Sequence, residues 1–267
     1  MTDHKVVIVI PFHKNTLSPL EMVSLQQLKK VLPNYPMVVV KPESREMPPE
    51  LTEAPFLTEA FDDKYFKDPK GYNNLVMTTE FYERFLAYDF MLIYQLDVFV
   101  FRDELQHWCN QGYDYIGAPW IHKYDYPDVV KATKSKLISY LHTRFNIMKD
   151  DLPSLMQLEN KVGNGGFSLR HVRKFYDATI KMQAEIAHYF ERPHHLYNED
   201  VFWSIEVNRK RKVLNIPGYR KAMQFAIENH PERGLELNHN KLPFGCHAFD
   251  RHLDFWRPIF KGYGYDI

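Results

Sequence analysis

Four segments of the chain carry side chains whose types and order suit cation binding or proton transfer. They are Asp97 beside an apolar run, the glycine pair Gly165 and Gly166, the acidic pair Glu199 and Asp200, and His247 near the end of the sequence. Carboxylate and imidazole groups hold divalent cations or act as general bases, and glycines let the backbone approach a ligand. Taken in this order, the four segments predict a metal-assisted transferase.

Asp97 is the first residue that needs an explanation. The apolar run from Phe90 to Ile93 is typical of a buried strand, and Asp97 follows it before a second apolar run begins. A carboxylate beside buried strands is costly unless it is paired or binds a cation. Open α/β sheets collect ligand groups at the carboxyl ends of their strands, so Asp97 is a candidate ligand for a magnesium or manganese ion. A solvated aspartate in a turn is the alternative.

The glycine pair and the late histidine suit ligand contact but also have simpler explanations. Gly165 and Gly166 allow close approach to a ligand or a positive φ, and Asn164 adds an amide that can bind hydroxyl groups. A tight turn explains the same three residues. His247 follows Cys246 in an apolar setting, where a hydrogen-bonded core histidine is the commoner outcome. Because the other Cys and His residues are scattered, a closed zinc site is not expected.

The acidic pair has the features of a helix start. Asn198 is a good N-cap residue, and Glu199 and Asp200 then fall in the first turn of a helix that runs to about Asn208. The helix dipole alone could account for both acids. If the helix start faces a cleft, however, Asp200 is well placed to accept a proton from an attacking hydroxyl group.

Composition limits the partners of the chain. The net charge is zero and the pI is about 7.2, so no global basic field favours nucleic acid. The one compact basic cluster, at 209–212, could touch anionic lipid headgroups or a phosphorylated acceptor, or be a solvated turn. Two distant cysteines fit a reducing compartment, and the cytosol is expected. The apolar runs are too short for a signal-peptide core or a membrane span, so membrane contact is at most peripheral.

The first half of the sequence predicts a parallel β-α-β unit. The β-branched run Val6 to Ile10 reads as a buried strand that ends in the polar loop Pro11 to Lys14. A helix start follows at Ser18, and the segment from Val38 to Val40 forms a second strand. Such a unit binds ligands at the carboxyl ends of its strands.

The remaining segments complete a single α/β domain with a mostly parallel central sheet flanked by helices. We expect a helix over 75–88, strands over 114–120 and 166–170, a helix over 171–190, and an irregular tail from 242. The lysine-rich segment 122–161 shows helix but no strand signal. We therefore divide the chain into a nucleotide-binding half (1–121), a helical insertion (122–161) and an acceptor and catalytic half (162–267).

The ordered motifs resemble glycosyltransferases of the GT-A fold, the nucleotide-diphospho-sugar transferases, over most of the chain. In that family an Asp-x-Asp motif ends a central strand, a glycine-bearing loop follows, an acidic motif opens a helix, and a C-terminal histidine completes the metal site. The matching segments here are Gln95 to Asp97, Asn164 to Phe167, Asn198 to Asp200, and His247. The overall pattern is similar to a bacterial branch of that superfamily.

The resemblance implies a role for each matching residue. Asp97 and His247 would bind Mn²⁺ or Mg²⁺, and Asp200, with Glu199 beside it, would be the catalytic base. The residues implied at the donor are Pro11, His13, Lys14, Asn73, Asn74, Gln95, Asn164, Gly165 and Gly166. One departure is that Gln95 stands where the family has its first acid.

The implied activity is that of an inverting, hexosyltransferase-like glycosyltransferase in polysaccharide biosynthesis. It would move a sugar from a nucleotide-diphosphate donor, with UDP-sugar expected, to a glycan or lipid-linked acceptor. The expected location is the cytoplasm, with at most peripheral contact at the inner face of the membrane. Two alternatives stay open: a non-catalytic nucleotide-sugar or carbohydrate-binding protein on the same fold, and a metal-dependent nucleotidyl- or phosphoryl-transferase.

Overall fold

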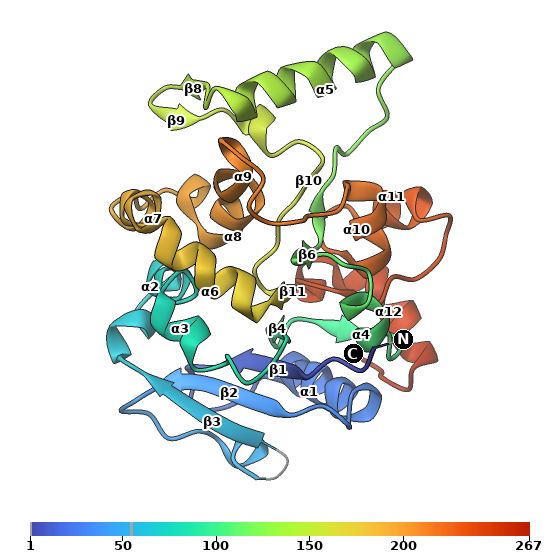
Figure 1. Ribbon diagram of the computed structural model, residues 1–267. Helices are drawn as coiled ribbons and strands as arrows, with labels where there is room; N and C mark the ends of the chain where they lie inside the picture. Colours follow the sequence, from blue (N-terminus) through green and yellow to red (C-terminus); the bar gives the residue numbers. More distant parts are fainter. Residues whose placement is uncertain (1, 54–55) are drawn as a thin grey trace.

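A six-stranded sheet flanked by helices forms the centre of the molecule (Figure 1). The computed structural model describes residues 2–53 and 56–267. Along the sheet the strands are β3 (Phe56–Phe61), β2 (Met37–Pro42), β1 (Val6–Pro11), β4 (Phe90–Tyr94), β11 (Phe167–His171) and β6 (Tyr115–Gly117). The first four run parallel, and β11 is antiparallel to both of its neighbours. The predicted mostly parallel sheet is therefore confirmed.

The first β-α-β unit forms as the sequence predicts. Helix α1 (Pro19–Val31) starts at Ser18, whose hydroxyl accepts the Glu21 N–H, while the Glu21 carboxylate accepts the Ser18 N–H. Strand β1 is buried from Val6 to Ile10 because helices cover both faces of the sheet. Pro11 to Lys14 consequently leave the sheet at its carboxyl edge, beside the end of β4.

Several predicted segments differ in detail from the structure. Of the helix expected over 75–88, only the short α3 (Thr79–Glu83) forms, and α2 (Pro69–Leu75) ends where the expected helix was to begin. Thr78 separates the two, because it caps α3 by accepting the Phe81 N–H. The helix expected over 171–190 divides at Met182 into α6 (Val172–Lys181) and α7 (Gln183–Phe190). The tail is not irregular, since it holds β13 (Gly245–Cys246) and α12 (Leu253–Gly262).

The insertion 122–161 is helical but also contains strands. Helix α5 (Val129–Arg144) leads into a hairpin of β8 (Met148–Lys149) and β9 (Leu152–Pro153), and β10 (Lys161–Val162) pairs with β7 (Pro119–Trp120). The expectation of no strand was wrong because two-residue strands are too short to show an alternating pattern. Figure 1 shows α5 at the top of the molecule, away from the six-stranded sheet.

A second, three-stranded sheet brings the C-terminal part of the chain back to the end of β4. In it β13 lies between β12 (Ala226–Ile227) and β5 (Phe99–Val100), and Cys246 is the register partner of Phe99. The remaining helices are α4 (Leu105–Cys109), α8 (Glu199–Val201), α9 (Val207–Arg209), α10 (Tyr219–Phe225) and α11 (Pro231–Leu237). Within the described residues, no helix combines the length and the apolar character needed to cross a membrane.

Candidate active site

Asp97 and His247 meet where β13 pairs with β5. Cys246 of β13 lies opposite Phe99 of β5. His247, which follows Cys246, therefore faces the turn that precedes β5 and contains Asp97. His247 Nε2 is 3.2 Å from Asp97 Oδ1, and His247 Nδ1 is 3.3 Å from Glu228 Oε1. The imidazole of His247 therefore lies between two carboxylates, one from each side of the small sheet.

The two carboxylates dominate the electrostatics of His247. Burial lowers its pKa, but Asp97 and Glu228 outweigh this effect and raise the pKa to about 10. Burial likewise works to raise the pKa of each carboxyl group, yet the facing imidazole holds both below their usual range. In this structure the cluster stabilises positive charge at the position of the His247 ring.

The side chain of Gln95 supplies a third polar atom at the same point. Gln95 Oε1 is 3.4 Å from His247 Nε2. Asp97 Oδ1 is buried without a well-oriented hydrogen bond, although His247 Nε2 lies close to it. Carboxylate and amide oxygens are ligands that suit Mn²⁺ or Mg²⁺, and an imidazole nitrogen is a ligand for divalent transition metals. Across the described residues, no three His, Cys, Asp or Glu side chains are grouped to hold an ion, so an ion here would use Gln95.

The glycine pair makes room for these side chains. A Cβ atom on Gly166 would overlap both His247 Nε2 and Gln95 Oε1, and one on Gly165 would overlap the carboxylate of Glu199. Neither glycine has a positive φ. The close approach expected at Gly165 and Gly166 is thus made to side chains of the protein itself.

Asn164 is engaged behind the histidine. Its side chain is buried, with Nδ2 2.8 Å from His247 Nδ1, while Oδ1 accepts the Phe167 N–H at 2.9 Å. The Asn164 backbone exchanges two hydrogen bonds with the Tyr115 hydroxyl group. Asn164 therefore fixes the orientation of His247, and its amide is not free for the donor hydroxyl groups that the sequence suggested.

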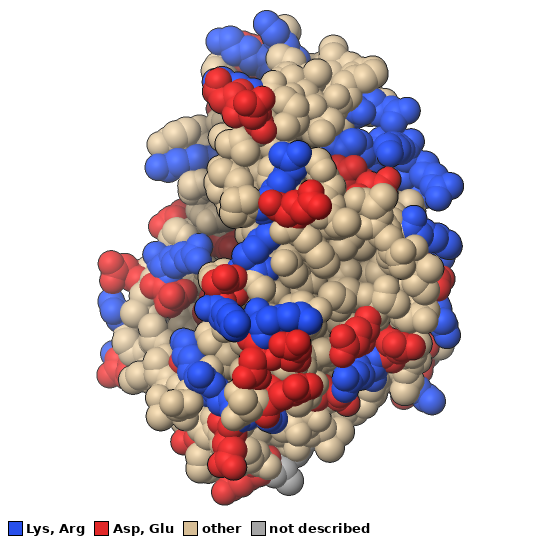
Figure 2. All heavy atoms as spheres, turned by 90° about the vertical axis from the view of Figure 1, so that its left-hand side faces the viewer, with Lys and Arg blue, Asp and Glu red and all other residues tan. Residues whose placement is uncertain are grey.

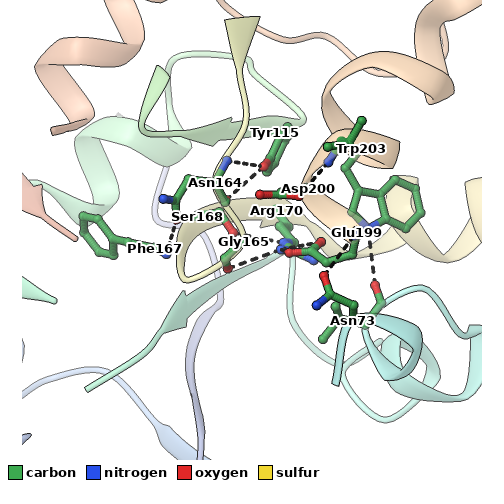
Figure 3. Close-up of polar contacts among 12 residues, drawn as sticks. Asn73, Tyr115, Asn164, Gly165, Phe167, Ser168, Arg170, Glu199, Asp200 and Trp203 are labelled. Carbon is green, nitrogen blue, oxygen red and sulfur yellow. Dashed lines mark hydrogen bonds and ion pairs between the residues drawn. The ribbon is translucent and has the colours of Figure 1, made fainter. Parts of the chain in front are cut away.

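Glu199 is locked in a fully buried ion pair (Figure 3). Both of its carboxylate oxygens lie 3.0 Å from Nη2 of Arg170, a residue of β11. The other two guanidinium nitrogens of Arg170 also donate hydrogen bonds within the protein, Nη1 to the Tyr82 hydroxyl group and Nε to Ser168 Oγ. Glu199 thus ties the start of α8 to the central sheet.

Asp200, the next residue, has a different environment. Its side chain keeps some exposure, and in Figure 3 it points toward the loop of Asn164 while Glu199 turns to Arg170. Burial raises the pKa of Asp200 to about 8, with further contributions from the charges of Glu199 and Glu228. A carboxyl group of this kind gains and loses a proton near neutral pH.

The cap of α8 comes from a distant segment. The Asn198 side chain makes no capping hydrogen bond, contrary to the sequence prediction. The Glu199 N–H instead donates a hydrogen bond to Asn73 Oδ1, at 3.0 Å, and Asn73 Nδ2 donates one to the Pro69 carbonyl. After Val201 the helix continues as a π-helical segment, Phe202–Glu206, before α9. Such irregular turns are common at functional sites.

A cavity of about 590 Å³ opens at the carboxyl edge of the sheet beside this cluster. Six residues expected at the donor or the metal line it: Pro11, His13, Lys14, Asn73, Gln95 and Asp97. Tyr72 and Lys67 also line it. The lining does not include the other predicted site residues, which are Asn74, Asn164, Gly165, Gly166, Glu199, Asp200 and His247. Lys14 is paired with Glu21 at 2.7 Å, and burial together with Lys14 and Arg45 lowers the pKa of His13.

Sequence reasoning missed two residues of this site. Glu228 follows the two-residue strand β12, and Arg170 is a buried charge inside β11. A lone acid after the apolar pair Ala226-Ile227 was a weak signal for the first. No sequence signal pointed to Arg170, because its partner Glu199 is distant in sequence.

Comparison with solved structures identifies the fold class. An active-site mutant of LgtC matches with a TM-score of 0.52 at 13% identity, over 90% of this chain and 86% of that chain. Core-mannan synthase A (CmsA/Ktr4) from Aspergillus fumigatus, in its Mn/GDP form, matches with a TM-score of 0.52 at 12% identity, over 82% and 73%. The galactosyltransferase LgtC in complex with donor and acceptor sugar analogues gives 0.51 at 11%, over 90% and 86%. The fold is thus the GT-A fold that the motifs predicted.

The chain itself belongs to the family described as "Protein of unknown function (DUF5672)", whose model matches residues 56–247. No curated protein matches its sequence.

Proposed function

We propose that this protein is a glycosyltransferase that moves a sugar from a nucleotide-diphosphate donor to an acceptor hydroxyl group with inversion. The observation that carries the proposal is the contact of His247 with Asp97, a residue that lines the cavity of about 590 Å³. A cavity of that volume is in the usual range for a small-molecule ligand. LgtC with donor and acceptor analogues and Ktr4 with Mn/GDP share the fold, which supports sugar transfer in general, while inversion is proposed from the motifs.

The donor would lie in the cavity, with its nucleotide along the loop Pro11 to Lys14. Tyr72 and Lys67 offer an aromatic ring and a cation there. We take a UDP-sugar as the first donor class to test and a GDP-sugar as the second. In this proposal residues 1–121 bind the nucleotide, and residues 162–267 supply the catalytic groups and the acceptor side.

The metal ion would be held by Gln95 Oε1, Asp97 Oδ1 and His247 Nε2. Bound there, Mn²⁺ or Mg²⁺ would neutralise charge on the diphosphate leaving group. Asn164 and Gly166 are positioning residues in this arrangement, because the first holds the His247 ring and the second leaves room for it.

Asp200 would act as the general base. Its carboxylate accepts the proton of the acceptor hydroxyl group, and the hydroxyl oxygen forms a bond to the anomeric carbon. The bond from that carbon to the diphosphate oxygen breaks, and its electron pair leaves with the nucleoside diphosphate. A pKa of about 8 lies near the value that favours general-base catalysis at neutral pH. We assign Glu199 a supporting role instead of the implied catalytic one, because Arg170 holds both of its oxygens.

The acceptor would be a glycan or a lipid-linked saccharide in polysaccharide synthesis. A cytoplasmic location, with peripheral contact at the inner membrane face, belongs to the same proposal. Both follow from the resemblance of the motifs.

A thermal-shift screen tests donor and metal together. UDP- and GDP-sugars are added with and without Mn²⁺, because a ligand that binds only the native state raises its stability with occupancy. The hit is then incubated with the protein, and release of nucleoside diphosphate is measured. Asp97→Asn should lose the effect of Mn²⁺, while Asp250→Asn, at another carboxylate lining the cavity, is the matched control.

Three results would contradict the proposal. Binding without any release of nucleoside diphosphate would favour a non-catalytic nucleotide-sugar-binding protein, which Gln95 in place of the first acid makes a specific alternative. Release of pyrophosphate or phosphate would favour a nucleotidyl- or phosphoryl-transferase. A product with the donor's anomeric configuration, seen by NMR, would overturn inversion and the role of Asp200 as the base.

A further inference from the structure

Helix α5 carries its large apolar side chains on its outer face. Val130, Leu137 and Tyr140 are 77%, 56% and 59% exposed. Val130 and Leu137 are seven residues apart, and Tyr140 follows three residues later, so the three share one side of the helix. The opposite side, toward the rest of the protein, has small or polar residues such as Ala132 and Ser139. Most large apolar side chains of α5 therefore face outward, where lysines lie among them, instead of facing the core.

The exposed apolar surface of the molecule is concentrated in this insertion. Of twelve exposed large hydrophobic residues in the described chain, ten lie within 122–161, and the other two are Leu57 and Ile180. The ten are Tyr124, Val129, Val130, Leu137, Tyr140, Leu141, Phe145, Ile147, Met148 and Leu155. Single apolar residues on a surface need no explanation, but a cluster of this kind marks an interaction site.

The same helix is basic. Lys131, Lys134, Lys136 and Arg144 all belong to α5, and the helix contains no Asp or Glu. None of these four forms an ion pair with another described residue. Arg144 donates to the Arg209 carbonyl at 2.9 Å, which joins α5 to the basic cluster at 209–212. Figure 2 shows Lys and Arg side chains, uncharged surface and a group of Asp and Glu side chains near the top of the molecule, where Figure 1 has α5 and the β8–β9 hairpin.

We propose that the outer face of α5 docks on a lipid bilayer that contains anionic headgroups. A helix with exposed apolar side chains and flanking cations lies in the interface of such a bilayer, with the apolar groups in the acyl boundary and the cations at the headgroups. A second copy of the chain is a poorer partner, since a two-fold contact would bring two basic helices together. This inference goes beyond the proposed enzyme activity and does not rest on it.

Vesicle flotation with the full chain tests the proposal. Vesicles of phosphatidylcholine alone are compared with vesicles that also contain phosphatidylglycerol. The protein should float with the second kind, and added salt should weaken the binding because it screens the headgroup charge. Lys131→Gln, Lys134→Gln and Lys136→Gln together should weaken binding about a hundredfold, roughly fivefold per charge. The triple variant Val130→Ser, Leu137→Ser and Tyr140→Ser should lose most of it.

Matched controls carry the same chemical changes elsewhere. Lys174→Gln with Lys181→Gln, and Leu57→Ser with Ile180→Ser, alter exposed residues outside the insertion and should leave flotation unchanged. Failure of the unmodified protein to bind the anionic vesicles would overturn the proposal, as would equal losses in the control variants. A dimer, detected by light scattering and abolished by the apolar α5 substitutions, would assign the face to a second copy and overturn it as well. Donor binding enters none of these measurements.

Discussion

At the scale of single residues, two adjacent acids have different partners, and this difference supports the different roles that we propose for them. Glu199 is buried against Arg170, while Asp200 is partly exposed with a pKa raised to about 8. The same short helix start can therefore supply both an anchor and a proton acceptor. Neither role follows from residue type, because both side chains are carboxylates in the first turn of one helix.

The first prediction concerns Asp200 in catalysis. Asp200→Asn cannot accept a proton, so transfer should fall by at least about a hundredfold, while donor binding in the thermal-shift assay stays unchanged. The rate of the unmodified protein should rise with pH toward a plateau above about pH 8, as Asp200 ionises. Steady-state kinetics over pH 5.5 to 9 measure this. A profile flat across that range would exclude Asp200 as the titrating base.

The second prediction concerns Asp200 in stability. The folded-state pKa is raised above the ordinary value of 3.8, so the native protein holds a proton that the unfolded chain has lost, and stability falls as pH rises from about 4 to 8. Asp200→Asn removes that loss and should be the more stable form at pH 8, with little difference near pH 4. A pKa difference of one is worth about 1.4 kcal/mol. Even a part of the Asp200 shift should therefore give Asp200→Asn a melting temperature a few degrees above that of the unmodified protein at pH 8. Calorimetry at both pH values should show the gain at pH 8 only.

The third prediction concerns the buried ion pair. Arg170→Met leaves the Glu199 carboxylate buried without its partner, so the free energy of unfolding should fall by about 3–5 kcal/mol. Arg170→Met combined with Glu199→Leu should recover part of the loss, because no charge is then left alone. Urea unfolding of the two variants measures the coupling. Equal losses in both would show that packing, and not the stranded charge, sets the cost.

At the scale of elements, the loop before β11 lies between the His247 cluster and the start of α8. Gly166 faces His247 and Gln95, Gly165 faces Glu199, and the Gly166 carbonyl accepts the Gln95 N–H at 2.9 Å. The loop can pass between these side chains only because it has no Cβ atoms at two consecutive positions. A short turn thereby couples the end of β4 to the start of α8.

The fourth prediction tests this loop. Gly166→Ala should displace His247 or Gln95. The apparent affinity for Mn²⁺, obtained from the thermal shift, should fall at least tenfold. Gly262→Ala is the control, because a Cβ atom there meets nothing within 4 Å. Titration of Mn²⁺ into both variants gives the comparison. Equal affinities in the two would mean that the loop can relax without disturbing the ligands.

At the scale of the whole molecule, the candidate active site and the outer face of α5 belong to different parts of the fold. The cavity lies at the carboxyl edge of the sheet, and α5 belongs to the insertion at the top of Figure 1.

The fifth prediction follows from this separation. The triple serine variant of α5 should keep the full donor-induced rise in melting temperature, measured in the same screen. A reduced rise would mean that α5 supports the cavity and is not a separate docking surface.

The sequence by itself determined the order of the motifs and the first β-α-β unit, because capping residues, apolar runs and turn residues act over short distances. Asp97 and the loop Pro11 to Lys14 could be assigned to the edge of the sheet from these local signals alone. Only the tertiary structure decided which partner each residue has: Asn73 and not Asn198 caps α8, Glu228 joins His247, and Arg170 takes Glu199. These pairings depend on strand register and on long-range burial. They join residues that are far apart in the chain, and no local pattern in either partner encodes them.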